Sequence, residues 1–291
     1  QHIFWRSFSI FVAGVILNAF PLIRQGWDWS DFRIMGVLQR IGLAYGLSAL
    51  MIIRFDFKQM IKILTSILLF YWILLWSGSG EGPYELESNL VRTFDIFILG
   101  QDHLYRGFGI PFDPEGTLST IPSIGTIIIG YLMGGMLHTT KNYNDCIKRM
   151  LAFGAALIIV GYLWGFLFPI NKALWTSSYV LFTGGIGAIV LSLLTYLIDI
   201  KRFKKPFWVF EIFGTNSIFI FILSGLWVKT IMNIKRELNG EMTSAYNYLY
   251  KTVFVPLAGD INGSLLFAIA HVIGFWLILY WMYKKNIQIK L

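Results

Sequence analysis

The residues best suited to proton transfer lie together in one polar stretch, QDHLYRGFGIPFDPEGTLST, at residues 101–120. His103, Asp113 and Glu115 supply an imidazole and two carboxylates, which are side chains that commonly act as general acids and bases. The Ser and Thr that end the stretch are typical N-cap residues, and the N-terminus of a helix favours an anion. We therefore predict these three residues as catalytic. A capped, turn-rich loop with solvated acids is the alternative.

A charged residue also interrupts the apolar segment VLQRIGLAY. Arg40 follows Gln39 there, and both side chains need polar partners. An Arg within an apolar stretch implies an anion or a water-lined cavity, because a guanidinium stays charged in proteins. We predict that Arg40 binds substrate.

A third group of polar and aromatic residues lies in PINKALWTSSYVLFTGG. It combines an amide, a cation, hydroxyls and aromatic rings, and its predicted substrate-binding members are Asn171, Lys172, Trp175, Ser178 and Tyr179. An aromatic belt at a membrane boundary, with a Lys that extends its ammonium to water, explains the same pattern.

The segment FEIFGTNSIFIF carries a fourth group, in which Asn216 and Ser217 follow Glu211 in otherwise apolar surroundings. We predict Asn216 and Ser217 as substrate-binding residues, and hydrogen bonding between helices is the alternative. The lone His271 needs no explanation beyond such bonding.

Standard catalytic and metal-binding motifs are absent from the sequence. There is no Walker A, HExxH or GxSxG pattern and no metal-spaced His/Cys cluster, so we expect no metal. Cys146 is the single cysteine, which excludes an internal disulfide.

The composition requires that lipid surround the elements carrying these residues. Hydrophobic residues make up 56% of the chain and charged residues 14%, with a mean hydropathy of +0.63. Soluble domains carry roughly 25% charged residues. The net charge of +8 does not indicate nucleic acid, because the basic residues form short clusters between apolar runs.

Eight segments are long and apolar enough to cross a bilayer. They are residues 7–23, 34–53, 60–77, 121–137, 150–169, 174–198, 207–228 and 263–283. The sequence contains no disordered linker, so we predict one all-α polytopic transmembrane helix bundle that forms a single domain over residues 1–291.

The positions of the basic residues predict the orientation of these spans. Alternate connections and tails, including those with Lys141 and Lys290, hold 14 of the 24 Lys and Arg residues. The long loop 78–120 is acidic instead. The positive-inside rule therefore predicts both chain ends in the cytoplasm and loops 78–120 and 229–262 outside.

The segment FDPEGTLSTIPSIGTIIIGYLMGG resembles the heparan-α-glucosaminide N-acetyltransferase family and its bacterial relatives. Other segments that resemble the family occur in the same order: FVAGVILNAFP, RIMGVLQRIGLAYGLSAL, QDHLYRG, NKALWTSSYVLFTGG and PFWVFEIFGTNSIFIF. The resemblance implies an integral membrane enzyme, in a bacterial inner membrane, that takes acetyl from cytoplasmic acetyl-CoA as co-substrate. It implies transfer to the amino group of a glucosamine-type sugar or glycan fragment outside.

One feature of the family has no counterpart in this sequence. The family's best candidate for the catalytic His lies on a loop between two helices upstream of the matched region, so we expect a fragment or a shortened homologue that lacks it. On this resemblance His103 and Asp113 line the sugar site.

Two other functions fit the pattern. One is a transporter of an amino sugar or related solute through a cavity at Arg40 and Asn216, and the other is an inactive structural relative. The expected partners are the sugar and membrane lipid, without nucleic acid, and a homo-oligomer is left open.

Overall fold

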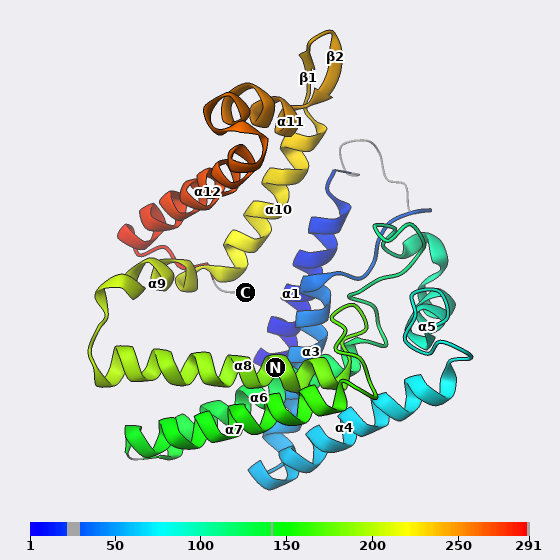
Figure 1. Ribbon diagram of the computed structural model, residues 1–291, viewed down its shortest axis with the longest axis vertical. Helices are drawn as coiled ribbons and strands as arrows, with labels where there is room; N and C mark the ends of the chain where they lie inside the picture. Colours follow the sequence, from blue (N-terminus) through cyan, green and yellow to red (C-terminus); the bar gives the residue numbers. More distant parts are fainter. Residues whose placement is uncertain (22–29, 141, 290–291) are drawn as a thin grey trace. The chain divides into compact units, whose positions relative to one another are not determined.

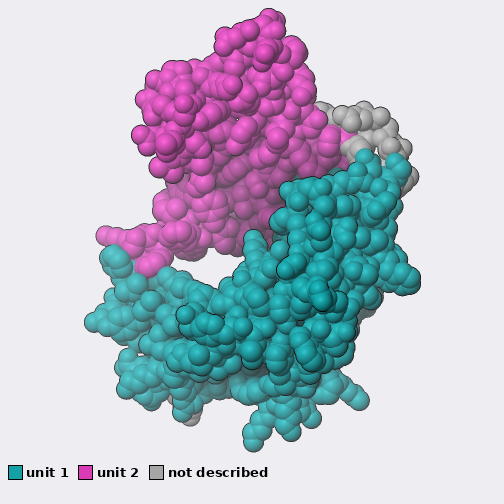
Figure 2. Space-filling view, turned by 45° about the vertical axis from the view of Figure 1, so that its right-hand side comes forward, with its two compact units in different colours: residues 1–18, 28–203 teal, residues 19–27, 204–291 magenta. Residues whose placement is uncertain are grey.

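The structure of the 291-residue chain is a computed structural model, and it describes residues 1–21, 30–140 and 142–289. Residues 22 and 23 of the first expected span, together with Lys141 and Lys290, lie outside the described residues. The chain divides into two compact units, residues 1–18 with 28–203 and residues 19–27 with 204–291 (Figure 2). The sequence predicted one domain. Each unit is described by itself.

The first unit is a bundle of long helices with one short helix in a loop (Figure 1). Its helices are α1 (His2–Ala19), α3 (Val37–Arg54), α4 (Phe57–Gly78), α5 (Leu90–Leu99), α6 (Thr120–Thr139), α7 (Tyr143–Trp164) and α8 (Ser177–Thr195). A 3₁₀ turn, Gln101–His103, follows α5, and a π-helical turn, Tyr196–Ile200, extends α8. All except α5 are long and apolar enough to span a membrane.

Side chains at the helix starts explain where several of these helices begin. Asp56 caps α4 by accepting from the Gln59 N–H, and the Gln59 side chain accepts from the Asp56 N–H in return. Thr176 caps α8 by accepting from the N–H of Tyr179. Such caps satisfy N–H groups that have no partner within the helix.

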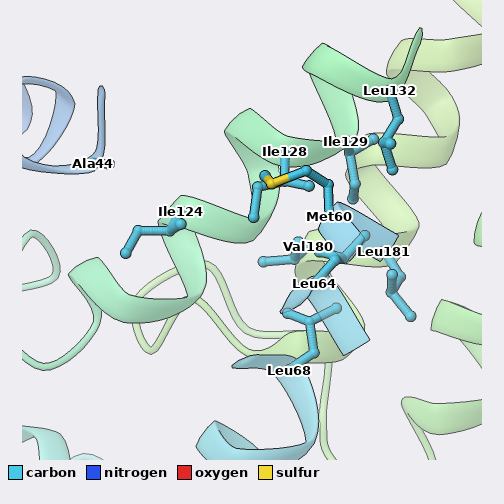
Figure 3. Close-up of a cluster of buried hydrophobic side chains, with 10 residues drawn as sticks. All are labelled: Ala44, Met60, Leu64, Leu68, Ile124, Ile128, Ile129, Leu132, Val180 and Leu181. Atoms are coloured by element: carbon cyan, nitrogen blue, oxygen red, sulfur yellow. The ribbon is translucent and has the colours of Figure 1, made fainter. Parts of the chain in front are cut away.

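Aliphatic side chains from four helices of the first unit form its largest core cluster (Figure 3). The members are Ala44 of α3; Met60, Leu64 and Leu68 of α4; Ile124, Ile128, Ile129 and Leu132 of α6; and Val180 and Leu181 of α8. This cluster packs α3, α4, α6 and α8 against one another.

Helices α7 and α8 approach closely at a pair of glycines. A Cβ at Gly185 would lie 2.6 Å from the carbonyl oxygen of Gly154, so a side chain cannot fit there. Small residues at such contacts are typical of helix packing in membranes.

The second unit combines helices with a small β-hairpin. Its elements are α9 (Trp208–Thr215), α10 (Ser217–Asn233), β1 (Lys235–Leu238), β2 (Glu241–Ser244), α11 (Ala245–Leu249), a π-helical turn (Tyr250–Phe254) and α12 (Val255–Lys284). The strands pair antiparallel around Asn239–Gly240, a dipeptide favoured in tight hairpin turns. Helices α9 and α10 meet at Asn216 with a bend of 72°.

The prediction of an all-α polytopic bundle is confirmed. The described residues contain seven helices that could cross a membrane, or eight if the bent α9–α10 pair counts as one span, and we expected eight. The segment 229–262 is not a long loop as expected. Its first residues, 229–233, end α10, the hairpin follows, and helix runs from Ala245 with a break at Gly259, whose φ is 75°. The orientation of the chain ends stays a prediction.

Candidate functional site

Three helices of the first unit, α3, α6 and α8, begin around one cavity of about 380 Å³. That volume lies within the range of small-molecule binding sites, roughly 300–1,000 Å³. Its polar and aromatic wall consists of Arg40, Glu115, Ser123, Thr126, Lys172 and Trp175, and the rest of the wall is aliphatic. The cavity therefore gathers residues from three of the stretches singled out in the sequence.

Arg40 lies in the first turn of α3 and is 4% exposed. One guanidinium nitrogen, Nη2, donates to the carbonyl of Pro114 and to the hydroxyl of Ser119. The ring of Trp175 stacks 4.7 Å from the guanidinium carbon. The other two nitrogens, Nε and Nη1, are buried without a hydrogen-bond partner among the described residues. Arg40 thus borders the cavity and carries two buried donors that no described residue satisfies.

Arg33, just before α3, binds both acids of the DPEG turn. Its Nε and Nη2 donate to the two carboxylate oxygens of Asp113, each at 2.8 Å, and Nη2 also donates to Glu115 Oε2 at 2.8 Å. Burial disfavours the charge on Arg33, but the hydrogen bond and attraction of Asp113, and then those of Glu115, outweigh it and raise its pKa. The ring of Tyr105 covers the guanidinium at 4.7 Å.

The two acids, Asp113 and Glu115, differ in burial and in access to the cavity. Asp113 is completely buried, and its Oδ1 also accepts from the N–H of Glu115 at 2.9 Å. The Glu115 side chain is 18% exposed and lines the cavity, with Oε2 paired to Arg33. Glu115 can therefore meet a ligand, whereas Asp113 holds Arg33 in place.

The loop before α8 presents Lys172 and Trp175 to the cavity. Asn171 shapes it, because its side-chain oxygen accepts from the N–H groups of Ala173 and Leu174 at 2.8 and 3.3 Å. Trp175 adopts a positive φ of 52°, and its indole N–H donates to Thr126 Oγ1 at 3.2 Å.

Ser178 and Tyr179 lie behind this loop. The hydroxyl of Ser178 is buried and donates to the carbonyl of Phe168 at 2.5 Å. The ring of Tyr179 packs edge-on against Trp175, with ring centres 5.2 Å apart. The two residues support the cavity wall and are not among its lining side chains.

His103 lies on the 3₁₀ turn after α5, away from the lining of the cavity. Its Nδ1 is 2.7 Å from the carbonyl oxygen of Phe32, and its own carbonyl accepts from the N–H of Ile34. Since a carbonyl only accepts, Nδ1 carries the hydrogen of this bond. His103 thereby holds the segment that leads to Arg33 and α3.

Asn216 and Ser217 belong to the second unit. Asn216 donates to the carbonyl of Ile287 at 3.0 Å and accepts from the N–H of Ile289 at 2.8 Å, so it holds the chain after α12. Ser217 is exposed at the start of α10. A separate apolar cavity of about 450 Å³ in this unit includes His271, whose Nδ1 is 2.9 Å from the carbonyl oxygen of Phe267.

No protein-family model matches the chain. The chain is 28% identical over 280 residues to the heparan-α-glucosaminide N-acetyltransferase of Mus musculus, a match that covers 76% of this chain and 41% of the mouse protein. It is 27% identical over 273 residues to the enzyme of the same name from Homo sapiens, covering 75% and 41%. The chain is related to these N-acetyltransferases. It spans about two fifths of their length, and the predicted resemblance to the family is confirmed.

Three residues around the cavity were not predicted from the sequence. Arg33 immediately precedes an expected span, Thr126 is a hydroxyl within one, and Asp95 is a single acid in the apolar run of α5. A single acid in an apolar run is a usable signal for Asp95, and an Arg directly before a span is a weaker one for Arg33. Among the described residues no three His, Cys, Asp or Glu side chains gather in a way that could hold a metal.

Proposed function

We propose that this integral, multi-pass membrane protein takes part in acetyl transfer from acetyl-CoA to the amino group of a glucosamine-type sugar. The observation that carries the proposal is the pairing, in one cavity wall, of two partnerless guanidinium donors on Arg40 with the carboxylate of Glu115. The name of the related mouse and human enzymes supports the reaction type. A cytoplasmic donor and a bacterial inner membrane are part of the proposal.

Arg40 has the chemistry to stabilise the transition state of acyl transfer. When an amine attacks a thioester, the carbonyl oxygen gains negative charge, and fixed donors in a site shielded from water stabilise it. Nε and Nη1 of Arg40 are such donors, and Trp175, Pro114 and Ser119 hold the guanidinium so that it need not reorganise.

Glu115 has the chemistry to receive the acceptor. An amino sugar arrives as an ammonium ion and must lose a proton before its nitrogen can attack. The carboxylate of Glu115 attracts the ammonium and takes that proton. The C–N bond then forms, the thioester C–S bond breaks, and the sulfur leaves as a thiolate that accepts a proton.

The rest of the wall suits a sugar. Trp175 offers an aromatic surface to the ring, and Lys172 offers hydrogen bonds to hydroxyl groups. His103 and Asp113 position this site in the proposal, through Phe32 and Arg33, and do not touch the substrate.

The deciding experiment follows labelled acetyl from acetyl-CoA to a panel of amino sugars with purified protein. We expect Arg40→Ala to lower kcat about 100-fold or more, as expected when oxyanion donors are removed, and Glu115→Gln to lower it about 100-fold, at the lower end of the range for general bases. Glu81→Gln, an exposed acid on the same loop, is the control and should transfer at the normal rate.

Three outcomes would contradict the proposal. Saturable sugar flux into vesicles without acetyl-CoA would indicate a transporter, and binding of neither ligand would indicate an inactive relative. Normal transfer by both Arg40→Ala and Glu115→Gln would move the chemistry away from this cavity.

A further inference from the structure

Asp95 of α5 is a completely buried acid that the proposed mechanism does not use. Its Oδ1 accepts from the N–H of Thr117 at 2.9 Å, from the N–H of Leu118 at 3.2 Å and from the hydroxyl of Thr117. Its Oδ2 is buried and has no hydrogen-bond partner among the described residues. A single oxygen atom therefore ties α5 to the turn that precedes α6, at a distance of more than 20 residues along the chain.

The backbone of that turn lies directly on the carboxylate. A Cβ at Gly116 would be 1.7 Å from Asp95 Oδ2, which no side chain could tolerate. Gly116 therefore allows the turn to close over Asp95. The fit leaves no space for a longer acid at position 95.

The same turn carries the atoms that hold Arg40. Its Ser119 hydroxyl and the carbonyl of Pro114 accept from Arg40 Nη2. Gly116 donates its N–H to the carbonyl of Asp113 at 3.0 Å and accepts from the hydroxyl of Thr120 at 2.9 Å. A shift of the turn would move these acceptors, together with Glu115 on the same segment.

We propose that Asp95 is a positioning residue of this site: its buried carboxylate fixes the 113–119 turn, and through that turn the guanidinium of Arg40 and the carboxylate of Glu115. The inference rests on the proposed function for its effect on transfer. Its structural part, the anchoring of the turn, holds independently of any activity.

Ionisation of Asp95 links this anchor to pH. Burial raises the pKa of Asp95 to about 6, against the hydrogen bonds from Thr117 and Leu118 that lower it, and the nearby Asp113 raises it further. Arg40 of α3 and Tyr71 of α4 are the other ionisable groups that interact electrostatically with it. The ionised carboxylate is the stronger acceptor for Thr117 and Leu118, so it orients the turn for transfer above pH 6, although burial makes this ionised form the less stable one.

The first measurement is hydrogen exchange of the peptide covering residues 113–119 in purified protein at a fixed pH of 7. We expect Asp95→Ala to speed its exchange about tenfold or more and Asp95→Asn, which keeps an acceptor oxygen, to speed it less. Asp102→Asn is the matched control, because that acid is exposed on the same loop and pairs only with Arg106 among the described residues. Unchanged exchange in Asp95→Ala would overturn the anchoring.

The second measurement is the acetyl-transfer rate of Asp95→Asn divided by that of the native protein, at each pH. The ratio cancels the ionisation of the sugar amine. Because the ionised fraction of an acid with a pKa of about 6 falls about tenfold from pH 7 to pH 5, we expect the ratio to rise by up to tenfold over that interval. If the rate ratio does not change with pH while the exchange of the 113–119 peptide responds to Asp95→Ala as expected, ionisation of Asp95 does not control transfer.

Thr117→Val tests the same link without altering the acid. It removes one hydrogen bond that lowers the pKa of Asp95, so the acid limb of the rate should move to higher pH, which a purely structural defect would not produce. If no variant or native protein transfers acetyl, the proposed function fails, whereas the exchange experiment still decides whether Asp95 anchors the turn.

Discussion

Asp113 and Glu115 show how two acids on one turn come to have different duties. Both contact Arg33. Asp113 is completely buried and both of its carboxylate oxygens accept hydrogen bonds from that guanidinium, whereas Glu115 lines the cavity. Spacing along the sequence predicted a group of acids near a helix start. It could not separate their roles, because the separation depends on Arg33, 80 positions away from Asp113.

This difference predicts that removing the charge of Asp113 mainly lowers stability, whereas removing the charge of Glu115 mainly lowers the transfer rate. Asp113→Asn leaves a largely buried Arg33 without its two-point partner and should lower the free energy of unfolding by about 3 kcal/mol. Glu115→Gln should change stability by less than about 1 kcal/mol while abolishing most transfer. Thermal unfolding in detergent measures both, with Asp102→Asn as the exposed-pair control near zero. Equal destabilisation by the two variants would contradict the division of roles.

Asp95 leads to a second prediction, on stability against pH. The folded protein holds the proton of Asp95 up to a pKa of about 6, whereas an unfolded chain releases it near 3.8. This group therefore favours the fold most below pH 4, its contribution declines between pH 4 and 6, and the loss, about 3 kcal/mol, is complete above pH 6. Asp95→Asn cannot ionise, so its stability relative to the native protein should rise over that interval.

Unfolding of both proteins at a series of pH values measures the difference in their free energies of unfolding. The contributions of the other acids cancel in this difference because both proteins contain them. A difference that stays constant from pH 4 to 8 would mean that Asp95 does not titrate in this range. A variant that is more stable yet transfers more slowly at pH 7 would mark Asp95 as a charge kept for function at the expense of stability.

At the scale of elements, the long helices were predictable because about 20 consecutive apolar residues leave few alternatives. Helix α5 was not predicted, since ten residues with a buried acid resemble any loop segment. The hairpin β1–β2 was missed for the same reason, as each strand has only four residues. The sequence also did not predict that the N-terminal ends of α3, α6 and α8 lie around one cavity, because no sequence pattern indicates which helix ends become neighbours.

The contact between α7 and α8 is testable with two glycines of the same helix. Gly185→Ala places a methyl group 2.6 Å from the Gly154 oxygen and should lower the free energy of unfolding by about 1–3 kcal/mol. Gly187→Ala meets no atom within 4 Å and should be neutral or slightly stabilising, since Ala favours helix. Thermal unfolding of the two variants compares them directly. Similar losses in both would argue against the close approach of α7 and α8.

At the scale of the whole molecule, the cavity lies where α3, α6 and α8 begin, so the antiparallel neighbours α4 and α7 end on its side. Loop 78–120 and the loop before α8 therefore share that end of the first unit (Figure 1). The distribution of Lys and Arg predicts that this end faces outward. Acetyl drawn from the cytoplasm would then have to reach an acceptor that binds from the other side.

Cysteine labelling in intact cells tests this orientation, and the chain is suited to it because its single cysteine, Cys146, is buried. In a Cys146→Ser background, Asp102→Cys should react with a membrane-impermeant maleimide from outside, because Asp102 is exposed on loop 78–120. Lys58→Cys, exposed at the start of α4, should react only after the membrane is opened. The reverse pattern would put the cavity, with Arg40 and Glu115, on the cytoplasmic side, and donor and acceptor would then meet without any transfer across the membrane.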